Sequence, residues 1–194
     1  MNELANEAPN YARFQFFLGI LLDHAGAYEE AKVALEKAHQ LSPGKQAILF
    51  EYGLNAFARN ANDEAVAHFK EAFDAAPEFD DSRTYYIAAL IRAGKDSEAD
   101  ALLQPMMESG KGTDARIASA YAARGMYTKI VDIWKAHIAK KPDDLEARFV
   151  LAGAYYSAGD TASALQTLED AKKTFPEATA QADQLIQQVK AGVK

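Results

Sequence analysis

The residues best suited to acid–base or metal chemistry are His24, His39, His68 and His137, together with adjacent carboxylate pairs at 29–30, 80–81 and 143–144. The histidines are scattered: none forms an HExxH motif, and no two lie one helical turn apart with a third ligand nearby. Each carboxylate pair stands where a helix is predicted to begin, and capping and the helix dipole account for acids there. Phosphate-binding glycine loops and nucleophile elbows are also missing. The sequence therefore predicts no catalytic residue, no cofactor site and no metal site.

The composition of the chain disfavours several kinds of partner and site. The chain has 194 residues, no cysteine and a net charge of −7, with 49% apolar and 25% charged residues. Disulfides and thiolate metal sites are excluded, while both cytoplasmic and extracytoplasmic locations stay open. An acidic chain disfavours nucleic acid and anionic lipid, because both bind clustered cations. No apolar run approaches 18 residues, so we expect no direct membrane insertion by this segment.

The stretch from Gln46 to Pro77 sets the pattern for the rest of the chain. Its apolar and small residues recur every three or four positions in each half, which predicts two amphipathic helices. Asn60 to Asn62 interrupts the pattern, so the two helices form a hairpin. A two-helix hairpin cannot bury both faces alone and needs a neighbour.

The same pattern returns at intervals of 34 residues. A shift of 34 takes Pro43 to Pro77 and Ala31 to Ala65 to Ala99, and it also takes Pro142 to Pro176. This period, with Leu18-Gly19, Ala31, Leu35, Ala38 and Pro43 in one copy, is similar to the tetratricopeptide repeat family. The resemblance implies an all-α solenoid forming a single domain over residues 1–194. Its repeats are expected near 12–45, 46–79, 80–110, 111–144 and 145–178, with a capping helix over 179–194.

Some local boundaries follow from individual residues. We expect residues 1–10 to be a frayed lead-in and the first helix to run from about Tyr11 to His24. Pro105 removes a backbone donor, which predicts a kink or an end of its helix near Gln104, followed by a loop over 109–112. Within each hairpin one position of the first helix should meet one position of the second where the helices cross, as in the pairs Gly19/Ala31 and Gly53/Ala65. No pair has two large residues, because isoleucine appears in two pairs and stands opposite an alanine each time.

The family resemblance also implies where binding would occur. In tetratricopeptide arrays the first helix of each repeat lines a concave groove that binds a protein or peptide. Carried over to this sequence, the candidate groove residues are Arg13, Phe16, Ile20, Phe50, Leu54, Phe57, Thr84, Ile91, Arg92, Phe149 and Tyr156. Their apolar character favours an apolar peptide or helix as ligand, although partial cover by neighbouring helices would explain the same residues. Phe16, Ile20 and Leu54 replace the Lys and Asn of the family's carboxylate clamp, so that mode is disfavoured.

A second resemblance offers an alternative function. Residues 10–53, NYARFQFFLGILLDHAG…LSPGKQAILFEYG, look similar to repeats at the C-terminal end of bacterial membrane glycan polymerases and ligases of the O-antigen type. That resemblance implies an extracytoplasmic accessory domain. The sequence leaves two functional classes open, an interaction scaffold and this accessory domain.

Overall fold

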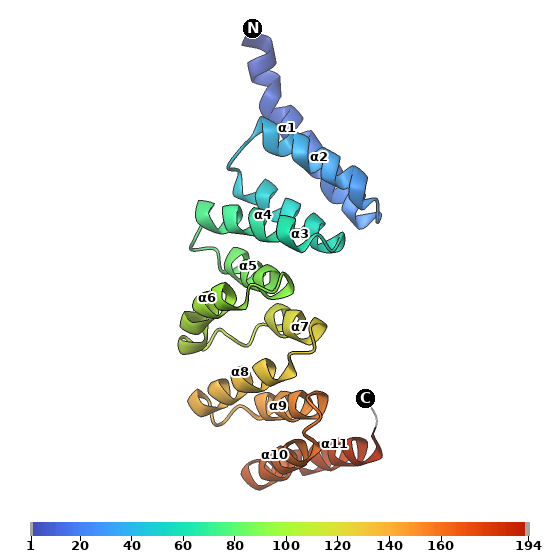
Figure 1. Cartoon of the computed structure of the whole chain (residues 1–194), viewed down its shortest axis with the longest axis vertical. Coiled ribbons are helices and arrows are strands. Elements are labelled where there is room, and N and C mark those ends of the chain that lie inside the picture. The colour runs from blue at the N-terminus through green and yellow to red at the C-terminus, as the bar shows by residue number, and fades with distance from the viewer. Residues whose placement is uncertain (1, 193–194) are drawn as a thin grey trace. The chain divides into compact units, whose positions relative to one another are not determined.

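The computed structural model describes residues 2–192, with side chains from residue 11 onward, and the described residues are helical with no strand. The chain divides into two compact units, residues 1–99 and 100–194. Figure 1 shows short helices joined by tight turns, in sequence order within each unit. The all-α repeat architecture predicted from the 34-residue period is confirmed.

The first unit is built from consecutive helical hairpins. Its helices are α1 (Asn2–His24), α2 (Tyr28–Leu41), α3 (Gln46–Ala58), α4 (Asn62–Ala75), α5 (Asp80–Arg92) and the start of α6 (Asp96–Glu108). Helix α1 packs on α2, α3 on both α2 and α4, and α4 on α5. Each helix therefore covers the one before it, as expected when a single hairpin cannot bury its own apolar stripe.

The second unit continues the pattern from within α6. Its helices are α7 (Ala115–Ala123), α8 (Tyr127–Lys140), α9 (Leu145–Ser157), α10 (Thr161–Thr174), the 3-10 turn η1 (Pro176–Ala178) and α11 (Thr179–Ala191). Ala182 and Ile186 of α11 pack into a core with Phe149 of α9 and Leu168 of α10. The exposed side chains of α11 are otherwise polar or alanine, which confirms the predicted capping helix.

One predicted helix boundary is wrong, and a second is corrected in part. Helix α1 begins at Asn2 rather than near Tyr11, so residues 2–10 of the expected lead-in are helical. Helix α6 runs through Pro105 to Glu108, so it does not end near Gln104, and the alternative of a kink there stays a prediction. Pro105 has no backbone N–H, so the carbonyl oxygen of Ala101 lacks its usual partner in the helix. Both residues are exposed, so water can bond to that carbonyl instead. The loop after this helix is where the sequence placed it.

The repeat register is visible in burial and in the turns. Ala31, Ala65, Ala99 and Ala164 occupy equivalent positions, and each is 0% exposed. Asn60 takes the turn position that Gly26 and Gly94 hold in neighbouring repeats, and its φ of 57° is left-handed. Asparagine tolerates this conformation better than most residues. Arg92 also donates a hydrogen bond of 2.8 Å to the Asn60 side-chain oxygen, which helps to hold the turn.

The helix crossings differ in detail from the predicted pairs. A Cβ added to Gly19 would lie 2.6 Å from a side-chain carbon of Leu35 and 3.5 Å from the Ala31 carbonyl oxygen. One added to Gly53 would lie 2.7 Å from two ring carbons of Phe69. The small residue of the first helix thus makes room mainly for the large residue one turn after the alanine. Spacing alone could not show this, because side-chain direction decides which atoms meet.

Gly53→Ala should lower the free energy of unfolding, whereas Gly153→Ala, also in the middle of a helix, should raise it. At Gly53 the new methyl group overlaps the buried Phe69 ring; overpacking of about 1–3 kcal/mol outweighs the ~1 kcal/mol gained in helix propensity. At Gly153 no atom from outside the local helix backbone lies within 4 Å of the added methyl, so Gly153→Ala should stabilise by about 1 kcal/mol. Urea unfolding of both variants measures the change in stability. If both variants were more stable than the wild type, the close contact between Gly53 and Phe69 would be contradicted.

Candidate functional site

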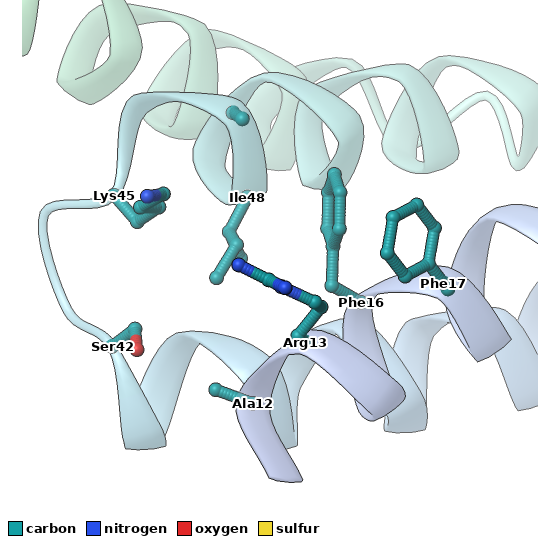
Figure 2. A pocket seen from close by; sticks show the side chains of 8 residues that line it. Ala12, Arg13, Phe16, Phe17, Ser42, Lys45 and Ile48 are labelled. Carbon is teal, nitrogen blue, oxygen red and sulfur yellow. The ribbon is translucent and has the colours of Figure 1, made fainter. Parts of the chain in front are cut away.

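A pocket opens between α1 and α3 in the first unit. Its volume is about 230 Å³, and it is lined by Ala12, Arg13, Phe16, Phe17, Ser42, Lys45, Ala47 and Ile48. Figure 2 shows Arg13 and Phe16 rising from α1 toward α3, with Ser42 and Lys45 on the turn between α2 and α3. We call it the N-terminal pocket. Aromatic walls with a few convergent polar groups are typical of ligand sites.

The N-terminal pocket carries positive charge in an acidic protein. Arg13 and Lys45 are both exposed, and neither has an ion-pair partner among the side chains described in residues 11–192. The chain as a whole has a net charge of −7. Two cations beside an aromatic wall suit a ligand that combines an apolar group with a carboxylate.

A second pocket of about 260 Å³ lies within the second unit, but three of its polar groups already pair with one another. Lys129 donates to both carboxylate oxygens of Asp100, at 2.8 and 3.1 Å, and the Tyr121 hydroxyl lies 3.2 Å from the same carboxylate. A ligand would have to displace these bonds. The N-terminal pocket is therefore the better candidate.

The candidate groove residues fall into separate environments. Arg13 and Phe16 line the N-terminal pocket, and Ile20 and Leu54 are half-buried on the same two helices without lining it. Thr84, Ile91 and Phe149 are 2%, 0% and 9% exposed, so they are core residues and offer no open surface. Tyr156 is half-buried in the second unit.

Phe50 and Phe57 belong to an aromatic cluster within the first unit. Their rings lie 5.7 and 5.1 Å from Phe69, and Tyr85 lies 5.2 Å from Phe50. The Arg92 guanidinium sits 4.6 Å from the Phe57 ring centre, a cation–π contact. These half-buried rings mainly hold neighbouring helices together, which is the partial cover that the sequence left open.

Sequence reasoning missed Ser42, Lys45 and Phe17 as pocket residues. Ser42 and Lys45 lie outside the first helices to which the family pattern assigns the groove. The available signal was charge: Lys45 directly precedes α3, where a cation is unfavourable next to the positive end of the helix dipole.

Two of the four histidines, His137 and His68, have clear structural partners. His137 is 8% exposed, and its Nε2 lies 2.9 Å from the Asp144 carboxylate. This hydrogen bond is the main cause of the lowered pKa of Asp144, which also caps α9 by accepting from the Ala147 amide at 2.9 Å. His68 stacks on Tyr52 at 3.9 Å, and burial lowers its pKa. In the part of the chain with described side chains, no cluster of His, Asp and Glu could hold a metal ion.

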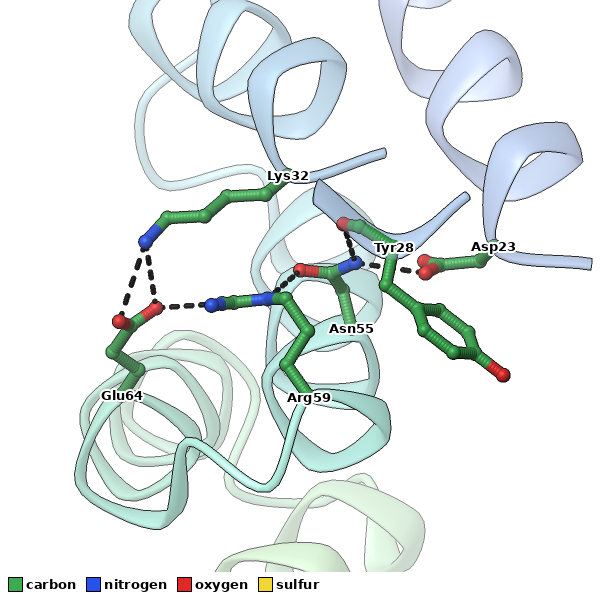
Figure 3. Close-up of polar contacts among 6 residues, drawn as sticks. All are labelled: Asp23, Tyr28, Lys32, Asn55, Arg59 and Glu64. Carbon is green, nitrogen blue, oxygen red and sulfur yellow. Dashed lines mark hydrogen bonds and ion pairs between the residues drawn. The ribbon is translucent and has the colours of Figure 1, made fainter. Parts of the chain in front are cut away.

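A buried polar network ties the first two hairpins together (Figure 3). The Asn55 amide is 0% exposed and donates to Asp23 at 2.7 Å and to the Tyr28 carbonyl oxygen at 2.8 Å. Its own oxygen accepts from Arg59 at 2.9 Å. Arg59 and Lys32 both pair with Glu64, and the hydrogen bond from Arg59 is the main cause of the lowered Glu64 pKa. Every polar atom of the Asn55 side chain is thus used, which is what a buried amide requires.

Two carboxyl groups near this network have raised pKa values. Burial raises the pKa of Asp23, against the lowering effect of the Asn55 hydrogen bond. Burial also raises the pKa of Glu51, and the negative charge of Asp23 adds to the shift. Ionisation of either carboxyl group therefore lowers the stability of the folded protein.

Glu51→Gln should raise stability at pH 7. A carboxyl group whose folded pKa is raised contributes stability that is full below its unfolded pKa and is lost as the pH rises through the folded pKa. The wild type should therefore lose stability as the pH rises from about 4.5, the ordinary glutamate value, and Gln removes that loss. Thermal melts between pH 4 and pH 7 check this, and an equal gain at both ends would exclude ionisation as the cause.

The comparisons with known proteins agree on the fold. The family model described as "Tetratricopeptide repeat" matches residues 56–124 and 121–189. The crystal structure of MamA protein has a TM-score of 0.62 at 15% identity, covering 90% of this chain and 96% of that one. A tetratricopeptide repeat protein from Parabacteroides merdae has a TM-score of 0.60 at 18% identity, covering 82% and 63%. At these identities the likeness shows the fold alone.

A further solved structure, YrrB, is described as a tetratricopeptide repeat protein with an unusual peptide-binding site. Its TM-score is 0.56 at 19% identity, covering 92% of this chain and 93% of that one. No curated protein matches the chain.

The comparisons do not support the resemblance of residues 10–53 to membrane glycan polymerases and ligases. Among residues 2–192, no helix combines the length and apolar character needed to cross a membrane. The family model covers more than half of the sequence, and the register of buried alanines agrees with it. The chain belongs to the tetratricopeptide repeat family.

Proposed function

We propose that this protein is a non-enzymatic interaction scaffold that binds a peptide segment in the N-terminal pocket. The observation that carries the proposal is the pairing of Phe16 and Phe17 with the cations Arg13 and Lys45 around one opening. The tetratricopeptide fold, and a peptide-binding site in one structural neighbour, support the general class.

The pocket suggests which peptides would bind. A volume of about 230 Å³ has room for one large apolar side chain rather than a whole helix. Arg13 and Lys45 would then pair with a carboxylate close to that side chain, either an acidic residue or a chain terminus. The mode differs from the family's carboxylate clamp in the residues that supply the charge.

Two matched fluorescein-labelled peptides test the charge preference. Both carry the same Leu and Phe residues, and the remaining positions are Glu in one peptide and Lys in the other. Fluorescence anisotropy should show tighter binding of the acidic peptide, with affinity that falls as salt is added. Equal affinity for the two peptides would contradict the proposal.

Variants locate the binding site. Arg13→Glu with Lys45→Glu should weaken the acidic peptide by about tenfold or more, equivalent to about 1.4 kcal/mol. Lys37→Glu with Lys135→Glu makes the same change in net charge at two exposed lysines that do not line the pocket. If the control pair weakens binding as strongly, the attraction is a general charge effect and the assignment to the pocket is wrong.

A further inference from the structure

Two half-buried histidines lie where the first hairpin meets the second. His39 belongs to α2, and His68 belongs to α4. The same two helices are joined nearer their N-terminal ends by the Lys32–Glu64 ion pair, at 3.1 Å (Figure 3). His39 is close enough for its charge to act on the His68 ring. We call His39 and His68 the histidine pair.

The Nδ1 atom of each ring in the histidine pair is closed to solvent. Both atoms have less than 1 Å² of accessible surface, and neither has a hydrogen-bond partner among the described residues. A neutral imidazole can leave one nitrogen as an unused acceptor, whereas protonation turns both nitrogens into donors. A buried donor without an acceptor is costly, so both sites favour the neutral ring.

The surroundings of His68 decide the direction of its response to pH. Its ring stacks on Tyr52 of α3, with ring centres 3.9 Å apart. The Glu71 and Glu64 carboxylates on its own helix favour the protonated ring. Positive charge on His39 and Lys32, across the boundary on α2, disfavours it. Burial is the largest effect, and the pKa of His68 is lowered.

This lowered pKa gives the stability of the first unit a defined pH dependence. A histidine whose folded pKa is lowered contributes stability that is full above its unfolded pKa, about 6.5. That contribution is lost as the pH falls towards the folded value. If His39 is also charged, two cations lie on opposite sides of the boundary, and their repulsion acts to separate the two hairpins.

The histidine pair is linked to the N-terminal pocket through α2. Ser42 and Lys45, which line the pocket, lie on the turn that follows this helix. The Ser42 N–H donates to the His39 carbonyl oxygen at 3.2 Å. Helix α2 also packs on α1 and on α3, the two helices between which the pocket opens. Movement of α2 away from the second hairpin would therefore change the walls of the pocket.

We propose that the histidine pair makes the N-terminal pocket sensitive to pH, because its protonation loosens the contact between the first two hairpins. A peptide held in the pocket at neutral pH is then released in mild acid. The release rests on the proposed function, whereas the loosening of the hairpins does not. Protonation of buried histidines is a general way to bias an interface near neutral pH.

A single thiol tests the loosening without any peptide. Ile48→Cys places a thiol at a 4% exposed position of α3 that lines the pocket, in a chain that has no other cysteine. Its rate of reaction with 4,4′-dithiodipyridine is compared with the rate when His68→Phe is added. Phenylalanine keeps a ring that can stack on Tyr52, but it cannot be protonated. Because both proteins carry the same thiol, its own response to pH cancels in the ratio of rates.

The two rates should agree at pH 7.5. At pH 5.5 the thiol should react about threefold faster or more when His68 is present, because only then does acid open the boundary. Equal rates at both pH values would overturn the proposal. The comparison between variants is essential, because Asp23 and Glu51 have raised pKa values and respond to acid in the opposite direction.

His24→Phe is the matched control for position. His24 is exposed on α1, so the same chemical change there removes a histidine that is not buried at the boundary. The faster reaction of the Ile48→Cys thiol at pH 5.5 should persist in this variant. Loss of the acid response with His24→Phe as well would refute the assignment to the histidine pair.

The acidic peptide of the binding assay tests the release. Its glutamates remain largely ionised at pH 5.5, since their ordinary pKa is about 4.3. Affinity for the wild type should fall by about threefold or more between pH 7.5 and pH 5.5, whereas His68→Phe should retain it. An equal fall in both proteins would overturn the link between the histidine pair and the pocket. Absence of binding at both pH values would refute the proposed function, and the thiol rates decide the loosening independently.

Discussion

Asn55→Asp should be the most destabilising single-atom change in the first unit. It replaces an NH₂ group, which donates to Asp23 at 2.7 Å and to the Tyr28 carbonyl oxygen at 2.8 Å, with an oxygen. Both contacts become repulsive, and the site is 0% exposed, so water cannot relieve them. Breaking a buried charged or hydrogen-bonded pair in this way costs about 3–5 kcal/mol.

The loss should depend on pH in a defined direction. The new carboxyl group faces the Asp23 carboxyl, whose pKa is already raised by burial. A raised folded pKa means that stability is retained at low pH and lost as the pH rises through it. Urea unfolding should therefore show a smaller deficit near pH 4 than at pH 7.

Asn60→Asp is the matched control for this change. Asn60 is exposed, and its side-chain oxygen, which Asp retains, is the atom that accepts from Arg92. We expect a change within about 0.5 kcal/mol. If Asn55→Asp were equally mild, the buried network would contribute little to holding the first two hairpins together.

Ala65→Leu should be the second large effect. Ala65 is 0% exposed on α4, at the position that alanine also fills in the repeats of Ala31, Ala99 and Ala164. Three additional carbon atoms would have to enter a closed helix crossing, and overpacking of this size costs about 3 kcal/mol.

Ala67→Leu makes the same chemical change two residues further along the same helix. Ala67 is exposed, so the larger side chain meets solvent and the change should stay within about 0.5 kcal/mol. Thermal melting of the two variants side by side measures the difference. Equal melting temperatures would mean that the repeat register is misassigned.

The candidate site was only partly predictable from the sequence. Arg13 and Phe16 were identified from their position in the first helix of a repeat, and both line the pocket. Lys45 and Ser42 were not, because they come from a turn whose path depends on how α2 and α3 pack. Phe50 and Phe57 satisfied the same positional rule as Phe16, but the rings of Phe69 and Tyr85 partly cover them.

Local patterns in the sequence are enough to predict the helical hairpins, their 34-residue register and the family. These features depend on local periodicity and on small residues at fixed intervals, and Ala31, Ala65, Ala99 and Ala164 report them directly. Which apolar residues are covered depends on how the helices pack. Phe14 and Ile48 hold the same register position, yet one is 61% exposed and the other 4%, because α3, which carries Ile48, packs on α2 as well as on α4. Burial in a repeat array depends on neighbours, and a residue's own position in its repeat does not specify them.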